Sequence, residues 1–186
     1  MIKIRFNGRG GQGAKTAAQL LVGTAIQKGK YIQAFPEYGP ERRGAPVKAF
    51  AKIDDKPIVS REPIDNPDVV VVIDATLLES ENICKGLDEK KGILIINTPK
   101  SGEEIRKETG GFGGKIYTVN ASHITMELLG INLPNTPMLG ALLKITNIVD
   151  IKVLEGVIKS KFEKKIGEKK TQLNIDAIQR AYDEVK

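Results

Sequence analysis

The chain of 186 residues is poor in the side chains that bind metals and clusters. It contains one cysteine, Cys84, and one histidine, His123, and it has no tryptophan. A single cysteine excludes internal disulfides and any iron–sulfur cluster held by cysteines of this chain. A single histidine excludes a metal site built from several histidines. The sequence therefore predicts that this chain by itself binds no metal or cluster.

Long apolar stretches and a strong excess of one charge are also missing. The longest uninterrupted apolar run covers residues 69–73, whereas a membrane span needs about 20 residues. Residues 1–6 alternate apolar and basic side chains, unlike a secretory signal peptide. The 29 basic and 23 acidic residues are interleaved, as on a solvated surface. We expect a cytoplasmic protein with no membrane or nucleic-acid partner.

The apolar pattern alternates between strand-like and helix-like segments. Runs that are apolar on both faces, such as residues 69–74, are typical of parallel strands covered by helices. Further strands are expected at residues 3–7, 31–35, 93–96 and 115–119. Residues 47–53 and 57–60 flank Asp54-Asp55 and predict an antiparallel hairpin. The expected fold is one α/β domain over residues 1–186, a three-layer Rossmann-like arrangement with a mostly parallel sheet and an antiparallel hairpin element.

Several residues are typical of helix starts. Ser101 and Glu104 form a capping-box pattern, and Pro137 follows Thr136 at a favourable first helical position. The other expected caps are Ser122, Asp150 and Asn174. The helix after Asp150 would place Ile151, Leu154, Ile158 and Phe162 on one inward face, and the last helix would turn Ile178, Tyr182 and Val185 inward.

A glycine-rich loop, residues 8–13, connects the first expected strand to the first helix. Its sequence Gly8-Arg9-Gly10-Gly11-Gln12-Gly13 matches G-x-G-x-x-G, in which glycines let a phosphate approach a helix N-terminus. Dinucleotide binding would also need an acidic residue at the end of the second strand, which reads Ile-Gln-Ala-Phe. A P-loop would need lysine directly after Gly13, but Ala14 intervenes. The alternative is that the loop is a tight turn that binds no ligand.

A second loop, residues 36–46, carries three prolines and the adjacent Arg42 and Arg43. Guanidinium groups can hold a phosphate or a partner carboxylate in bidentate fashion. Because both loops follow strands at one sheet edge, we expect Arg42 and Arg43 to lie near the glycine loop. The alternative is an ordinary surface turn.

Two further features have structural alternatives. Gly140 and Ala141 are small residues in an apolar helix, which favours close packing either within the core or at a subunit interface. Asp74 ends a strand, where α/β folds place ligands, but no second carboxylate accompanies it. We therefore assign no catalytic residue in this chain.

Four sequence blocks together resemble the gamma subunit of pyruvate:ferredoxin oxidoreductase. Two are the glycine loop, continued through Lys15-Thr16, and the segment from Gln33 to Pro46. The others are residues 67–74 and 135–142, and the likeness extends over nearly the whole chain.

The resemblance implies a multi-subunit enzyme that converts pyruvate to acetyl-CoA and reduces ferredoxin. Such complexes use thiamine diphosphate, Mg, iron–sulfur clusters and coenzyme A. Alpha and beta subunits would form the thiamine site and a delta subunit would carry clusters, so this chain alone would bind no cofactor and would not be catalytic. Its contributions would be assembly and part of the coenzyme A environment. The phosphates of coenzyme A suit Gly8, Gly10, Gly11, Gly13, Arg42 and Arg43.

Other functions stay open at this point. The chain could serve a complex for another 2-oxo acid, such as 2-oxoisovalerate. It could instead be a free-standing Rossmann-type nucleotide-binding protein, or a scaffold whose glycine loop binds nothing.

Overall fold

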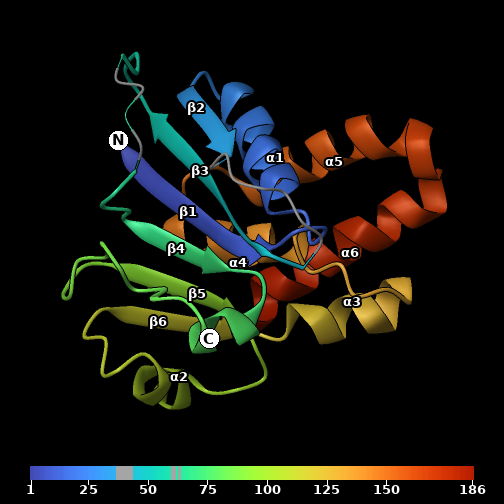
Figure 1. Cartoon of the computed structure of the whole chain (residues 1–186). Coiled ribbons are helices and arrows are strands. Elements are labelled where there is room, and N and C mark those ends of the chain that lie inside the picture. Colours follow the sequence, from blue (N-terminus) through green and yellow to red (C-terminus); the bar gives the residue numbers. More distant parts are fainter. Residues whose placement is uncertain (37–43, 60–61, 63) are drawn as a thin grey trace.

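The computed structural model in Figure 1 describes residues 1–36, 44–59, 62 and 64–186. A sheet of six strands lies between layers of helices (Figure 1). In chain order the elements are β1 (Ile2–Arg9), α1 (Ala14–Ile26), β2 (Tyr31–Pro36), β3 (Pro46–Asp54), β4 (Val69–Val72), the 3-10 helix η1 (Ala75–Glu79), β5 (Ile93–Asn97), α2 (Gly102–Glu108), β6 (Lys115–Val119), α3 (Ala121–Leu129), α4 (Pro137–Thr146), α5 (Ile151–Ile166) and α6 (Glu168–Glu184). None of the helices among these described residues has the length and apolar character that a membrane crossing requires.

The strands lie in the order β2-β3-β1-β4-β5-β6. Strands β1, β4, β5 and β6 are parallel, whereas β3 runs antiparallel to both of its neighbours, β1 and β2. The expected α/β fold with a mostly parallel sheet and an antiparallel element is confirmed. The carboxyl ends of the four parallel strands therefore meet at one edge, where open α/β sheets bind ligands.

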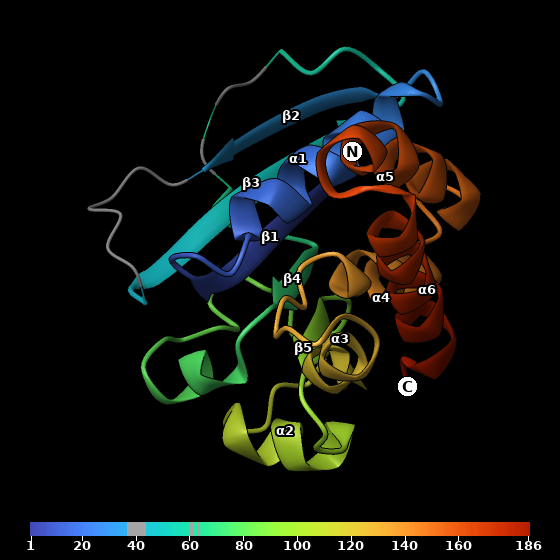
Figure 2. The ribbon, with the colours of Figure 1, turned by 90° about the vertical axis from the view of Figure 1, so that its right-hand side faces the viewer.

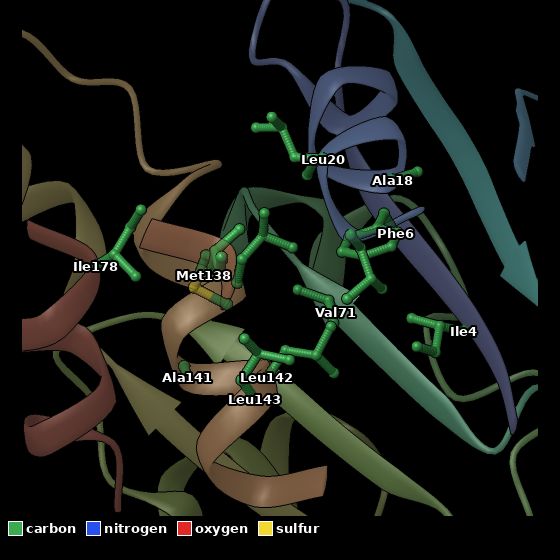
Figure 3. Close-up of a cluster of buried hydrophobic side chains, with 14 of the residues drawn as sticks. Ile4, Phe6, Ala18, Leu20, Val71, Met138, Ala141, Leu142, Leu143 and Ile178 are labelled. Carbon is green, nitrogen blue, oxygen red and sulfur yellow. The ribbon is translucent and has the colours of Figure 1, made fainter. Parts of the chain in front are cut away.

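Two hydrophobic cores cover the two faces of the sheet. Val69 and Val71 belong to the larger core, which packs beneath α1, α4, α5 and α6. Figure 3 shows its central side chains, including Phe6 from β1, Leu142 from α4 and Ile178 from α6. On the other face, Val70 and Val72 pack with residues of η1 and α2. Figure 2 shows these two helical layers on opposite sides of the strands.

The partners of residues 47–53 differ from those expected. These residues lie in β3 and pair with β1 and β2, and the described residues 57–59 form no strand. The proposed hairpin between 47–53 and 57–60 is therefore wrong. Pairing on both sides satisfies the backbone of β3 and buries Ala51 and Ile53 against the larger core. Pro57 lacks an N–H donor, and Val59 is 89% exposed, so this segment would gain little from joining the sheet.

Three of the expected helix starts are confirmed. Ser101 and Glu104 form a complete capping box, Asp150 accepts a hydrogen bond from the Lys152 N–H, and Pro137 begins α4.

Two expected caps are wrong. Asn120, not Ser122, caps α3, because Ser122 pairs with Asn97 at the end of β5. Asn174 lies inside α6, which begins at Glu168. The Asn174 amide donates to the Lys170 carbonyl, and its oxygen accepts from the Thr136 hydroxyl at 3.5 Å. The side chain of Asn174 therefore stabilises the contact between α4 and α6 rather than a helix terminus.

Helix α4 is a core helix of this chain. Its residues from Pro137 to Leu143 are buried, and α6 packs directly on it. A Cβ atom added to Gly140 would lie 2.2 Å from the Ile178 carbonyl oxygen of α6. Packing within the chain, rather than a subunit interface, thus accounts for the small residue at 140.

We predict that Gly140→Ala destabilises the protein by about 2–3 kcal/mol, because the new methyl group pushes α4 away from α6. Gly156→Ala in α5 is the matched control, since nothing lies within 4 Å of a Cβ there. That control should leave stability unchanged or raise it by up to about 1 kcal/mol. Urea unfolding of both variants tests the prediction, and similar effects of the two substitutions would contradict it.

Candidate functional site: the glycine loop at the carboxyl edge of the sheet

The glycine loop follows β1 at the carboxyl edge of the parallel strands and leads into α1 (Figure 2). Gly11 and Gly13 have φ angles of 95° and 79°, which L side chains rarely adopt. A Cβ at Gly13 would also lie 2.5 Å from the Asn135 amide nitrogen. Gly8 is buried, and a Cβ there would lie 3.4 Å from the Ala14 Cβ. Backbone conformation therefore requires glycine at positions 11 and 13, and close packing adds to the requirement at Gly13, whereas a Cβ at Gly8 would make only ordinary contacts.

The start of α1 is suited to an anion. The N–H groups in the first turn of a helix have no partner within the helix, and they carry the positive end of its dipole. Gly13 at the N-cap has no side chain to occupy them. Lys15 and Thr16 follow in the first turn and are exposed, and no acidic residue lies there. A phosphate would thus meet backbone donors and a lysine.

A hydrogen-bond network fixes the loop to the end of β4. The Gln12 side chain accepts from the Arg9 N–H at 2.7 Å and donates to the Asp74 carboxylate at 2.5 Å. The second oxygen of Asp74 accepts from the backbone N–H and the hydroxyl of Thr76, at 3.0 and 2.7 Å. Gln12 thus joins both ends of the glycine loop to a neighbouring strand.

Arg9 extends this network to the second loop. Its guanidinium donates to the Thr76 hydroxyl at 3.0 and 2.8 Å and lies 3.5 Å from the Asp74 carboxylate. It also donates to the Gly44 carbonyl at 3.2 Å. No role was expected for Arg9, Gln12 or Thr76. Asp74, just after β4, was the available signal, but its partners Arg9 and Gln12 lie more than 60 positions away in the sequence.

The network lowers the pKa of Asp74. Partial burial raises the pKa of this carboxyl, but hydrogen bonds from Thr76 and Gln12 and the positive charge of Arg9 outweigh it. The carboxylate is therefore ionised at neutral pH and stays available as an acceptor.

Gly8 lies near the end of β1, where it pairs with Val47, and Gly10, Gly11 and Gly13 lie in the turn between β1 and α1. The Gly10 N–H donates to the Ala45 carbonyl at 2.8 Å, and its carbonyl accepts from the Gly44 N–H at 3.1 Å. The described end of the second loop thus lies against the glycine loop. Arg42 and Arg43 lie outside the described residues, so their expected position stays a prediction.

The sheet topology fails to meet a second requirement of classical dinucleotide binding. In that fold a parallel second strand lies beside β1 and carries the acidic residue that holds the ribose. Here the antiparallel β3 occupies this place, so its carboxyl end lies at the opposite edge of the sheet. The glycine loop therefore lacks a neighbouring ribose-binding strand end.

Within the described part of the chain, no three histidine, cysteine or acidic residues are grouped to hold a metal ion. Burial, together with the nearby Glu89 carboxylate, raises the pKa of the half-buried Cys84 thiol to about 11. This thiol therefore stays protonated at neutral pH.

Comparison with known proteins assigns the family. Residues 3–184 match the family described as "Pyruvate ferredoxin/flavodoxin oxidoreductase". The chain belongs to this family. The resemblance seen in the four sequence blocks is thereby confirmed.

Curated relatives align over nearly their full lengths. The "Pyruvate synthase subunit PorC" of Thermotoga maritima is 50% identical, with 99% of this chain and 94% of the relative covered. The "Pyruvate/ketoisovalerate oxidoreductases common subunit gamma" of Thermococcus kodakarensis is 47% identical, with 98% and 96% covered. A crystal structure of pyruvate oxidoreductase subunit PORC from Thermotoga maritima superposes with a TM-score of 0.88 at 48% identity, covering 100% of this chain and 97% of the other.

We predict that Asp74→Asn destabilises this family member by about 1 kcal/mol at pH 7. The substitution removes the negative charge that Gln12, Thr76 and Arg9 contact. Solvent screens part of this charge, which keeps the effect small. The pKa of Asp74 is lower in the folded state, so its contribution is present above the unfolded pKa of about 3.9 and is lost as pH falls through the folded value. The difference between variant and wild type should therefore shrink below about pH 4. Thermal unfolding between pH 3 and pH 7 measures it, with the exposed Asp65→Asn as control. A difference that is constant with pH would contradict the prediction.

Proposed function

We propose that the chain is the gamma subunit of a pyruvate:ferredoxin oxidoreductase, which converts pyruvate to acetyl-CoA and reduces ferredoxin. The observation that carries this proposal is the 50% identity to a curated pyruvate synthase subunit along 99% of the chain. Residues 1–186 would act as one gamma-type domain in a cytoplasmic complex.

Chemistry in this complex would belong to other subunits. Alpha and beta subunits would hold thiamine diphosphate and Mg, and a delta subunit would carry iron–sulfur clusters that pass electrons to ferredoxin. One cysteine and one histidine in the whole sequence support this division, because clusters and transition metals need several such ligands. The gamma subunit would contribute to assembly and to the binding of coenzyme A.

The glycine loop is the part of this chain that suits coenzyme A. The pyrophosphate and 3′-phosphate of coenzyme A are acceptors with negative charge, which the N-terminus of α1 favours. Gly8, Gly10, Gly11 and Gly13 would let a phosphate approach the backbone closely. Arg42 and Arg43 would add charge from the second loop, whose described residues Gly44 and Ala45 contact Gly10. Arg9 and Gln12 would hold the loop in position.

A shared role is the second candidate. The Thermococcus kodakarensis relative is named as a subunit common to pyruvate and ketoisovalerate oxidoreductases, and it is 47% identical to this chain. The same gamma subunit would then serve a complex for 2-oxoisovalerate. A free-standing nucleotide-binding protein is disfavoured, because β3 replaces the parallel strand that would hold a ribose.

We predict that the isolated chain has no oxidoreductase activity and that the complex depends on it. The alpha, beta and delta subunits should be produced with and without this chain. Reduction of ferredoxin that depends on coenzyme A should then be measured with pyruvate and with 2-oxoisovalerate. Higher activity with pyruvate supports the first candidate. Activity with 2-oxoisovalerate, when this chain is combined with a second set of alpha, beta and delta subunits, supports the shared role. Full activity without this chain would contradict both.

We further predict that Arg42→Ala or Arg43→Ala raises the coenzyme A requirement of the complex about 10- to 150-fold, because a charge-assisted contact contributes about 1.5–3 kcal/mol. Arg→Lys at the same positions keeps the charge and should have a smaller effect. Steady-state kinetics with varied coenzyme A tests this. Loss of assembly instead would indicate that the arginines contact a partner subunit. Wild-type assembly and kinetics of the double variant would contradict both roles and support the interpretation of the loop as an ordinary surface turn.

A further inference from the structure

An apolar groove lies far along the chain from the glycine loop, between the end of α3 and the turn joining α5 to α6. Its volume is about 630 Å³. Figure 1 shows these three helices together on the right of the molecule. Six apolar residues contribute to its lining: Leu129, Ile131, Leu133, Phe162, Ile166 and Leu173.

The groove exists because α5 extends beyond the core. The buried residues of α5 are Leu154, Val157 and Ile158, all in the first half of the helix. Phe162 and Ile166 continue the apolar pattern, yet Phe162 is half-buried and Ile166 is 41% exposed. Across the groove, Ile131 is 53% exposed. Exposed apolar surface of this kind typically marks an interaction site.

Lysines line the same groove. Lys165, Lys169 and Lys170 are exposed, and the described residues that line the groove include no acidic one. Among the described residues, no salt bridge or hydrogen bond engages their ammonium groups. The polar lining residue Asn174 is already bonded to the Lys170 carbonyl and to Thr136. An occupant would therefore meet an apolar surface bordered by unpaired positive charge.

We propose that this groove is the docking site for an amphipathic helix of a partner subunit, with apolar residues along one face and acidic residues beside them. This inference rests on the proposed function, which supplies the partner subunits. Acidic side chains would pair with the three lysines, which steers association and fixes orientation.

The geometry favours a helix as the occupant. The walls of the groove are helices and the loop after α3, and no sheet edge borders it. An extended peptide could not add a strand here, whereas a helix satisfies its own backbone and buries one face. A second copy of this chain would meet the same lysines across a two-fold axis, and the chain already has a net charge of +6. Self-association through this groove is therefore disfavoured.

The test is co-purification of the alpha, beta and delta subunits with a tagged version of this chain. Two groove variants are needed. Ile131→Glu with Ile166→Glu places charge on the apolar lining, and both positions are exposed, so folding should be retained. Lys165→Glu with Lys169→Glu and Lys170→Glu reverses the border charge. Each variant should recover at least tenfold less of one partner subunit while keeping the wild-type circular dichroism spectrum.

Matched controls change the same residue types elsewhere. Ile26→Glu alters an apolar residue that is 57% exposed on α1. Lys28→Glu with Lys90→Glu and Lys152→Glu changes the net charge by the same amount at exposed positions outside the groove. Both controls should recover the partner subunits as the wild type does. Recovery of the complex should also fall with added salt for the wild type more than for the lysine variant.

The outcomes separate the two proposals. If the wild-type chain recovers none of the three subunits, the proposed function fails and the docking inference fails with it. If the wild type and both groove variants recover them equally, the docking inference alone is overturned. Dimerisation of the isolated chain that is lost in the Ile131→Glu, Ile166→Glu variant would overturn the partner helix in favour of a second copy.

Discussion

The burial of β4 on both faces is the constraint on which the rest of the molecule depends. Its four valines are completely buried, and alternate side chains enter two different cores. Full burial of one valine contributes about 1.5–3 kcal/mol, so exposure of either face would be costly. The strand must therefore lie centrally, with β1 and β5 as parallel neighbours and helices above and below. That position fixes the edge at which β1 and β4 end and at which the glycine loop forms.

Asp74 transmits this constraint to the glycine loop. It follows β4 almost immediately, and its carboxylate accepts hydrogen bonds from Gln12 and Thr76. The guanidinium of Arg9 donates in turn to the Gly44 carbonyl in the second loop. The loop is therefore shaped by contacts within the chain before any ligand arrives. Gly13 is explained by its positive φ and by packing against Asn135, and Gly11 by its positive φ, so the glycines alone do not demonstrate a ligand. A loop held in one conformation nevertheless loses less entropy on binding an anion, which favours the coenzyme A proposal.

Local patterns predicted most of the fold, and non-local pairing accounts for the errors. Residues 69–74 and 93–96 were identified as buried strands because their apolar runs depend on no particular partner. The partners of β3 were missed because two nearby segments suggested a hairpin, whereas burial of Ala51 and Ile53 requires β1. Asn174 has the chemistry of a cap but is bonded across helices. In the candidate site the glycine pattern is visible in the sequence, and its role in binding stays a prediction. The Gln12–Asp74 bond joins residues 62 positions apart and leaves no local signal.

The apolar face of α5 extends beyond the last residue of this helix that is fully buried in the core. Ile151, Leu154, Ile158 and Phe162 follow one helical face; Leu154 and Ile158 are fully buried, whereas Phe162 is half-buried and Ile166 is exposed. A helix of 16 residues is about 24 Å long, so its second half projects well past the last buried residue. Phe162 still packs against the larger core, whereas Ile166 in the last turn of α5 is 41% exposed. Ile166 borders the groove beside Lys165, Lys169 and Lys170, so the proposed partner helix would meet apolar surface and positive charge together. The groove lining also includes Leu133, two positions before Asn135, and the Asn135 amide donates to the Gly13 carbonyl at 3.4 Å, so the proposed docking surface and the glycine loop are connected by one short segment.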